Sequence, residues 1–216
     1  MLAALQGQGV PAGKPMEVKP EKKYFLIVCE GRRTEPLYFT HIQKFLPNDL
    51  LQTIEVLGQG DNTVNIVRKG IKKRRERAEN PLVPNYDEVW AVFDKDDFPM
   101  HKYDTAVQLA MEQGIEHGVS NQSFELWYIL HFELLESALH RKDYIPRLTN
   151  YLGFKYKKND AMVVTTLFAK GNVRQAIKWA KRLEKVHAGK TPSESCPYTR
   201  VHILVERLLA YAKFPS

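Results

Sequence analysis

Short apolar runs alternate with longer stretches of helical periodicity through the first part of the chain. The apolar runs predict buried strands at residues 24–29, 53–57, 88–93 and 115–119. Stretches in which apolar side chains recur every three or four residues follow these strands, at residues 36–45, 63–78, 103–111 and 124–135. Four successive strand–helix units predict an α/β fold, with a small, mostly parallel, four-stranded sheet and helices on both faces.

Several residues predict where these helices begin and which face they bury. Thr34 and Ser123 are suited to cap the first and the fourth helix. The buried stripe of helix 63–78 is predicted from its apolar spacing to comprise Val64, Val67, Ile71 and Ala78.

Helical periodicity alone continues from Ala138 onward. We expect a short helix after Asp143 that Gly153 closes, a helix after Asp160, an amphipathic helix over 172–187 and a last helix around 201–209. The predicted organisation is a disordered lead-in over 1–20, an α/β core over 21–137 and a helical region over 138–216 that packs on the core.

Acidic residues follow two of the predicted strands. Glu30 comes directly after the first strand, and Asp94 and Asp96 come directly after the third. The carboxyl ends of parallel strands form the edge at which open α/β sheets bind ligands, and carboxylate oxygens suit Mg²⁺. These acids therefore predict a site for Mg²⁺ or Mn²⁺, although acids after strands also serve as turn formers and helix caps.

Two residues of the fourth predicted helix each have two interpretations. Glu125 lies in the first turn, where it either stabilises the helix dipole or is a third acidic member of the site, able to bind a second ion. His131 lies between Leu130 and Phe132 and is either a satisfied core histidine or a catalytic group, with the core role favoured.

The net charge of +7 and the pI of about 9.3 favour a polyanionic partner such as nucleic acid. The predicted phosphate-contacting side chains are Arg32, Arg33 and Lys95 beside the acids, and Lys72, Lys73, Arg74 and Arg75 on helix 63–78. The alternative for that helix is an ordinary solvated face.

Two cysteines, Cys29 and Cys196, give neither a disulfide framework nor a zinc site, and Cys29 is expected in the core. The sequence shows no secretory signal and no apolar stretch long enough to span a membrane, so we expect a cytoplasmic protein.

A Glu after the first strand and Asp-x-Asp after the third resemble the Toprim domain of topoisomerases, primases and some nucleases. Three longer blocks resemble the RloB-like family, which includes the abortive-infection protein AbiLii. They are Cys-Glu-Gly-Arg-Arg-Thr-Glu-Pro-Leu-Tyr-Phe, Phe-Asp-Lys-Asp-Asp-Phe and Ser-Asn-Gln-Ser-Phe-Glu-Leu-Trp-Tyr-Ile-Leu-His-Phe.

The resemblance covers roughly residues 24–210 and implies a prokaryotic phage-defence protein with a Toprim-like core. It implies metal-dependent nuclease or phosphoryl-transfer chemistry in which Asp94 and Asp96 hold the metal and Glu30 is a further ligand or the general base. It also implies a P-loop ATPase on a separate chain, because this sequence lacks a Gly-x-x-x-x-Gly-Lys-[Ser/Thr] loop. The alternative function is a non-catalytic nucleic-acid-binding or regulatory subunit.

Overall fold

A parallel sheet forms the centre of the molecule in the computed structural model, which describes residues 23–46, 53–58, 62–97 and 99–212. The predicted lead-in over 1–20 lies outside these residues. The strand order is β2-β1-β3-β4, and all neighbours pair in parallel. The strands are β1 (Tyr24–Cys29), β2 (Thr53–Gly58), β3 (Glu88–Val92) and β4 (Glu116–His117). Cys29 lies level with Gly58 and with Val92, so the three long strands end at one edge.

The predicted α/β fold with a parallel sheet is confirmed, but its last strand is much shorter than expected. Of the expected strand at 115–119, only β4 pairs regularly with β3. The chain then leaves to form β5 (Ser120–Asn121), which pairs antiparallel with β6 (Tyr198–Thr199) near the end of the chain. The described residues therefore form three full-length parallel strands, a two-residue β4 and a separate antiparallel pair, and the prediction of four full strands is wrong.

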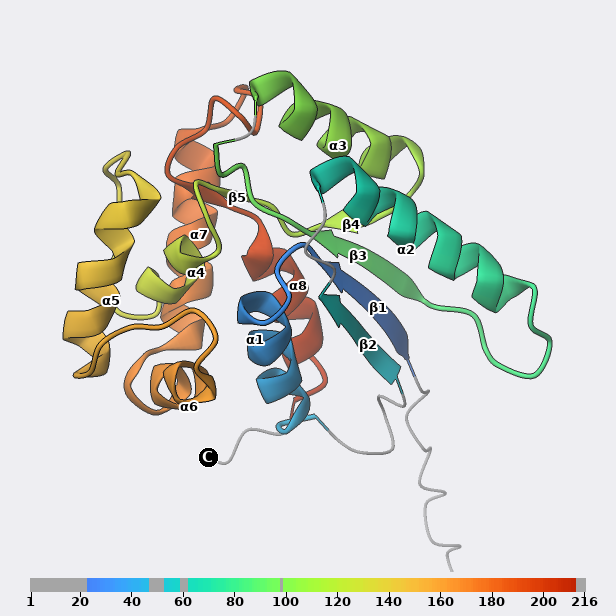
Figure 1. The fold of residues 1–216 in the computed structure, drawn as a ribbon, viewed down its shortest axis with the longest axis horizontal. Coiled ribbons are helices and arrows are strands. Elements are labelled where there is room, and N and C mark those ends of the chain that lie inside the picture. The colour runs from blue at the N-terminus through green and yellow to red at the C-terminus, as the bar shows by residue number, and fades with distance from the viewer. Residues whose placement is uncertain (1–22, 47–52, 59–61, 98, 213–216) are drawn as a thin grey trace, which may run out of the picture.

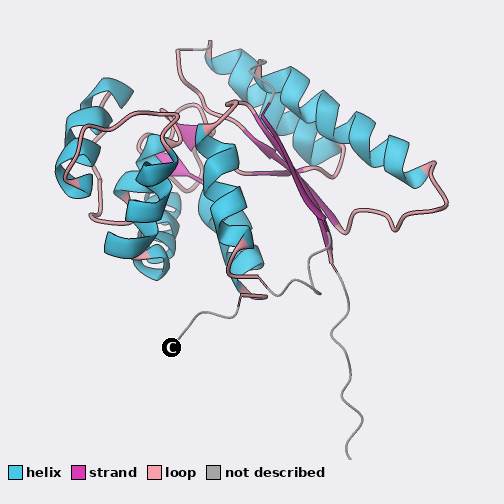
Figure 2. Ribbon diagram, turned by 60° about the horizontal axis from the view of Figure 1, so that its bottom comes forward, coloured by secondary structure: helices cyan, strands magenta, loops and turns pink. Residues whose placement is uncertain are grey.

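Helices cover both faces of the sheet, as the sequence predicts (Figures 1 and 2). Because successive side chains of a strand point to opposite faces, Leu26 and Val28 belong to one hydrophobic cluster and Ile27 to the other. The first cluster packs against α2 (Thr63–Ala78) and α3 (Met100–Glu112). The second packs against α1 (Thr34–Gln43) and α8 (Val201–Leu209).

The remaining helices extend the second cluster away from the sheet, on the side of α1 (Figure 1). They are α4 (Glu125–Ile129), α5 (Tyr144–Leu152), α6 (Ala161–Lys170) and α7 (Val173–Val186), and a 3-10 turn (Arg141–Asp143) precedes α5. Phe25 of β1, Trp127 of α4 and Leu167 of α6 belong to this one continuous cluster. The C-terminal helices thus complete the core of the sheet. Among the described helices, none combines the length and the apolar character needed to cross a bilayer.

The prediction of a long fourth helix is wrong, because α4 has only five residues. In a continuing helix the carbonyl of His131 would accept an N–H from the next turn. It instead accepts the N–H of Asn172 at 2.8 Å. Ser123 does not cap the helix, because its hydroxyl donates to the Glu125 carboxylate at 2.6 Å.

Thr34 is also not the predicted cap, because it is the first residue of α1 and its hydroxyl donates to the carbonyl of Lys158 at 3.0 Å. The predicted closure of α5 is confirmed by Gly153, whose φ of 83° is left-handed. The helix predicted after Asp160 is confirmed as α6, and the side chain of Asp160 caps it by accepting the N–H of Met162 at 2.9 Å.

The bounds of α2 agree with the prediction, but its buried face is shifted. Its fully buried residues are Thr63, Ile66, Val67 and Gly70, whereas Val64 and Ile71 are half-buried and Ala78 is exposed. Gly70 explains the shift, since a Cβ there would lie 3.3 Å from a methyl group of Val89. The absence of a side chain at Gly70 lets the backbone of α2 approach β3 closely.

Candidate functional site

The carboxyl edge of the sheet brings together the acids that follow β1 and β3. The N–H of Glu30 donates to the carbonyl of Val92 at 2.9 Å, which prolongs the pairing of the two strands by one residue. The N–H of Asp94 then donates to Oε2 of Glu30 at 3.0 Å. The predicted meeting of Glu30 and Asp94 at one edge is therefore confirmed.

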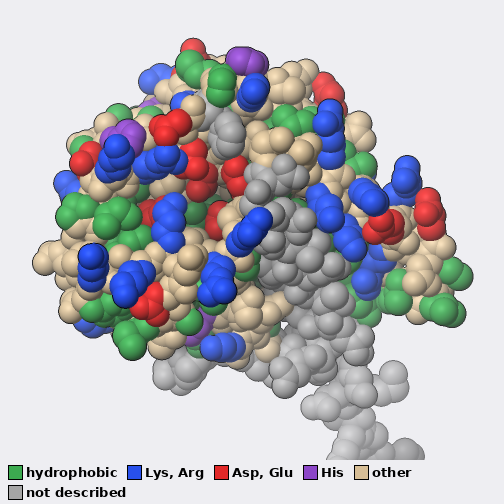
Figure 3. All heavy atoms as spheres, viewed as in Figure 1, with side chains coloured by type: hydrophobic (Ala, Val, Ile, Leu, Met, Phe, Trp, Pro, Cys, Tyr) green, Lys and Arg blue, Asp and Glu red, His purple; other side chains and the backbone are tan. Residues whose placement is uncertain are grey.

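A cavity of about 190 Å³ opens at this edge, and we call it the carboxylate cavity. Its titratable lining residues are Glu30, Arg32, Arg33, Glu35, Asp94, Asp96, Glu125 and Lys158. In the space-filling view, acidic side chains lie in a recess that Lys and Arg side chains surround (Figure 3). Five acids from three separate segments thus share one small, partly enclosed volume.

Asp94 is one of three buried acids of this cavity, with 8% of its surface exposed. Its Oδ2 accepts the N–H of Phe124 at 2.9 Å, whereas its buried Oδ1 has no hydrogen-bond partner among the described residues. Burial raises the pKa of Asp94 well above its usual range, and the neighbouring carboxylates of Glu35, Asp96 and Glu30 raise it further. Arg141 and Lys158 also interact with Asp94, but burial and the surrounding carboxylates outweigh their effect on its ionised form.

Glu35 is a site residue that the sequence interpretation missed. It is 4% exposed in the first turn of α1 and accepts the N–H of Gly31 at 3.2 Å. Burial raises the pKa of Glu35 to about 7, and the charge of Glu125 contributes to this rise. A carboxyl group with such a pKa can exchange a proton at neutral pH. The one feature of the sequence that could have identified Glu35 as a site residue is its position in the same acidic block as Glu30.

Both carboxylate oxygens of Glu125 have side-chain partners, in contrast to those of Asp94. Its Oε2 accepts from Ser123, and its Oε1 accepts from Tyr156 at 2.8 Å and lies 3.3 Å from Nζ of Lys158. Burial alone would raise the pKa of Glu125, but Lys158 and the two hydroxyl donors together hold it below its usual range. Glu125 is therefore an ionised member of the site whose charge is already compensated. Tyr156 and Lys158 carry no local signal of this role, because they lie about thirty residues away along the chain.

Asp96 adopts a left-handed backbone conformation with φ of 44°, which is uncommon for residues other than glycine. Its N–H donates to the carbonyl of Gln122 at 2.9 Å, and its carboxylate forms an ion pair with Arg141. Arg141 also contacts the carboxylate of Asp97 through its other terminal nitrogen. These two acids together raise the pKa of Arg141, although burial acts in the opposite direction. Arg141 is thus a cation at the border of the site that the sequence did not indicate.

The predicted phosphate-contacting residues fall into two groups. Arg32 and Arg33 are exposed and line the carboxylate cavity, whereas Lys95 is half-buried and does not line it. The basic residues of α2 lie apart from the cavity. Arg74 donates to the carbonyls of Gln113 and Gly114, at 2.9 and 3.1 Å, and thereby links α2 to the end of α3.

The remaining predicted basic residues of α2 have acidic neighbours on the same helix. Lys72 and Lys73 lie 3.7 and 3.6 Å from Glu76, and Arg75 lies 3.6 Å from Glu79. Exposed pairs of this kind are weak and do not prevent contact with phosphate. The role of this helix in nucleic-acid binding therefore stays a prediction.

His131 is a core histidine. It is 2% exposed, its Nε2 lies 3.2 Å from the hydroxyl of Tyr38, and its Nδ1 lies 2.9 Å from the carbonyl of Trp127. Burial lowers the pKa of His131 to about 4, so the ring is neutral at pH 7. Cys29 is likewise fully buried, as expected.

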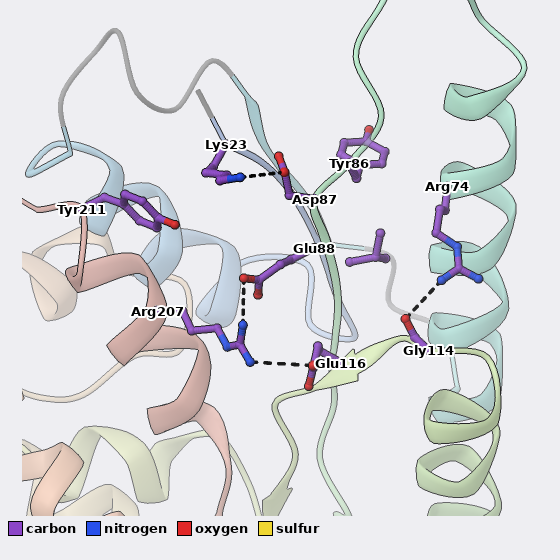
Figure 4. A pocket seen from close by; sticks show the side chains of 10 residues that line it. Lys23, Arg74, Tyr86, Asp87, Glu88, Gly114, Glu116, Arg207 and Tyr211 are labelled. Atoms are coloured by element: carbon purple, nitrogen blue, oxygen red, sulfur yellow. Dashed lines mark hydrogen bonds and ion pairs between the residues drawn. The ribbon is translucent and has the colours of Figure 1, made fainter. Parts of the chain in front are cut away.

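A second cavity of about 430 Å³ lies at the opposite, amino edge of the sheet, where β3 and β4 begin (Figure 4). Its charged side chains pair with one another, except Arg74, which binds the backbone carbonyls of Gln113 and Gly114. Asp87 lies 3.3 Å from Nζ of Lys23, and Arg207 lies 3.0 Å from Glu88 and 3.9 Å from Glu116. Opposite charges largely compensate each other here, so this cavity offers no concentrated charge for a ligand.

The chemistry of the carboxylate cavity fits a hard divalent cation. All of its candidate ligands are carboxylate oxygens, and the buried Oδ1 of Asp94 has no partner in the described part of the chain. No group of three or more His, Cys, Asp or Glu side chains within the described residues is already arranged as a metal site. Binding of a cation would therefore require these side chains to rearrange, including the ion pair between Asp96 and Arg141.

Comparison with known proteins places these observations in a family context. A sequence model of the family described as RloB-like protein matches residues 25–208. The comparison with curated proteins and the comparison with solved structures found no match. The matched range contains every residue that lines the carboxylate cavity.

Proposed function

The chain belongs to the RloB-like protein family, and we propose that it is a metal-dependent nuclease of a prokaryotic phage-defence system, with its catalytic site in the carboxylate cavity. The finer features of the proposal are a Toprim-like core related to that of AbiLii, a cytoplasmic location and a P-loop ATPase partner on a separate chain.

The observation that carries this proposal is the carboxylate of Asp94, which is buried among other carboxylates and forms no ion pair of its own with the described residues. Three other acids, Glu30, Glu35 and Asp96, raise the free energy of its ionised form, and its buried Oδ1 has no hydrogen-bond partner in the described residues. Packing of the sheet does not require such an arrangement, because charged groups in a partly buried site cost free energy unless they are paired. A cation would compensate these charges directly.

Asp94 and Glu30 would hold the metal together with Asp96 and Glu35. A bound Mg²⁺ or Mn²⁺ polarises a phosphodiester and lowers the pKa of a coordinated water. Glu125 would act as a positioning residue, since Ser123, Tyr156 and Lys158 already occupy its oxygens. Arg32 and Arg33 line the same cavity and would bind the phosphate of the substrate.

The experiment that tests this proposal compares cleavage and metal binding for one matched pair of variants. Labelled DNA and RNA, each single- and double-stranded, are incubated with the protein and Mg²⁺ or Mn²⁺, with and without the partner ATPase. We expect cleavage that excess chelator abolishes, and loss of cleavage in Asp94→Asn. Calorimetric titration with Mn²⁺ should show binding to the unaltered protein and at least tenfold weaker binding to Asp94→Asn.

The control variant is Glu88→Gln, which removes one acid from the opposite edge of the sheet. It should retain both metal binding and cleavage, because Glu88 lies at the other cavity and pairs with Arg207. Cleavage that is equally fast in excess chelator would refute the metal mechanism. Nucleic-acid binding without cleavage under every condition would support the alternative of a regulatory or binding subunit.

A further inference from the structure

A third cavity lies directly beside the carboxylate cavity and has the opposite charge. We call it the basic cavity, and its volume is about 330 Å³. Its lining residues are Ser123, Glu125, Arg141, Lys142, Ile145 and Lys158. Glu125 and Lys158 line both cavities, so these two side chains form the boundary between them.

The side chains around the basic cavity are oriented by the site next to it. Lys158 lies 3.3 Å from Glu125, and Arg141 contacts Asp96 and Asp97. Two cations are thus held at the border by acids that lie on or near the carboxylate cavity. Such fixed cations lose little conformational freedom when they bind an anion.

Lys142 supplies the positive charge that is available to a ligand. Its side chain is exposed and forms no salt bridge with the described residues. The single acid of the cavity, Glu125, is compensated by Lys158 and two hydroxyl donors. The lining of the basic cavity thus has three cations and one acid, whereas the lining of the carboxylate cavity has five acids and three cations.

We propose that the basic cavity binds a phosphate group of a nucleic-acid strand, next to the phosphate that the carboxylate cavity would cleave. This inference rests on the proposed function and adds that the substrate is an extended strand with phosphates in both cavities. The volume of the basic cavity exceeds what a phosphate needs and lies in the range of about 300–1,000 Å³ that is typical of small-ligand sites. Ile145 provides an apolar wall against which the adjoining sugar packs.

The test measures binding in a buffer without metal and again with Ca²⁺, so that binding is separated from cleavage. The probes are a short fluorescent oligodeoxythymidylate, the matching oligouridylate and a nucleoside monophosphate. We expect the oligonucleotides to bind more tightly than the monophosphate, because only a strand reaches both cavities. Lys142→Glu should weaken oligonucleotide binding about tenfold and reduce the slope of log affinity against log salt by about 0.7, the contribution of one phosphate on a single strand.

Lys178→Glu is the matched control. Lys178 is an exposed lysine of α7 that lines neither cavity, so its reversal gives the same change in net charge without altering the site. It should leave both affinity and salt slope close to those of the unaltered protein. Circular dichroism and urea unfolding should show that both variants are folded, since both positions are exposed.

The outcomes separate this inference from the proposed function. Equal weakening by Lys142→Glu and Lys178→Glu would overturn the inference, as would failure of the unaltered protein to bind either oligonucleotide in both buffers. Metal-dependent cleavage by the unaltered protein would then still support the proposed function. Selective weakening by Lys142→Glu without any cleavage would support the binding site and count against the catalytic proposal.

Discussion

The two edges of the parallel sheet both carry charged side chains around a cavity, but they compensate those charges in different ways. At the amino edge, Glu88 lies 3.0 Å from Arg207, and Asp87 lies 3.3 Å from Lys23. At the carboxyl edge, Asp94 is buried among other carboxylates and keeps one oxygen without a partner in the described structure. The first arrangement is explained by folding alone, whereas the second destabilises the metal-free protein.

This difference shows which acids deserve a functional interpretation. Sequence position does not separate the two groups, since acids stand at both ends of β3. Burial among other carboxylates, without an ion pair to a cation in the described part of the chain, does separate Asp94 from the acids of the amino edge. Neutralising an acid should therefore have opposite effects on stability at the two edges.

The largest expected effect is the change in the pH dependence of stability when Glu35 is replaced by Gln. Its folded pKa of about 7 lies above its ordinary value of 4.5, so the native state binds more protons than the unfolded chain between these values. The free energy of unfolding should therefore fall as the pH rises from about 4.5 to about 7. At about 1.4 kcal/mol per pH unit, the loss amounts to about 3 kcal/mol. Glu35→Gln should remove this loss in urea titrations with chelator, and the variant should be the more stable protein at pH 8 but not at pH 4.

The matched variant at the amino edge is Glu88→Gln. It should lower the free energy of unfolding by less than about 1 kcal/mol at pH 8, because it removes an ion pair whose members are both partly exposed. Stabilisation by Glu88→Gln, or destabilisation by Glu35→Gln at pH 8, would contradict the proposed difference between the edges.

A smaller effect is expected from crowding at Gly31. A Cβ at this position would lie 2.0 Å from Oε2 of Glu35, so the carboxyl group must move from the position in which it accepts the N–H of Gly31. Gly31→Ala should lower the free energy of unfolding by about 1–2 kcal/mol. In a double-mutant cycle the cost should fall below about 0.5 kcal/mol when Glu35→Ala is also present, because the two residues are in direct contact.

Gly114 at the amino edge supplies the comparison for this cycle. Its φ of 59° makes an alanine unfavourable through the backbone, while the nearest atom, Nη1 of Arg74, would lie at 3.8 Å. Because Gly114→Ala keeps the carbonyl to which Arg74 donates, its cost should be unchanged by Arg74→Ala. Equal costs of Gly31→Ala with and without Glu35 would show that the crowding argument is wrong.

The smallest expected effect comes from the backbone at Asp96. Alanine and glycine both remove its carboxylate, but only alanine keeps a Cβ at a φ of 44°. Chemical denaturation should show Asp96→Ala to be less stable than Asp96→Gly by about 1 kcal/mol. The same pair at Glu116, in β4 of the amino edge, should give the reverse order, because glycine weakens a strand. The same order at both positions would exclude a special backbone requirement at Asp96.

Local patterns in the sequence determined the α/β class, three of the parallel strands and the meeting of Glu30 with Asp94. They suffice because strand and helix periods are set by neighbouring residues, and because parallel strands necessarily end at one edge. The sequence also predicted His131 as a core residue, from the apolar residues on either side of it.

Tertiary contacts decided the rest of the site. Glu35 belongs to it because α1 packs its first turn against the sheet edge, and Lys158 and Arg141 reach it from segments beyond α4. The early end of α4 depends on the hydrogen bond between His131 and Asn172, which lie forty-one residues apart. Arg74 holds α3 through backbone carbonyls that no charge pattern reveals. Hydrogen bonds and ion pairs between distant segments form only after the chain has folded, so the periodicity of neighbouring residues carries no record of them.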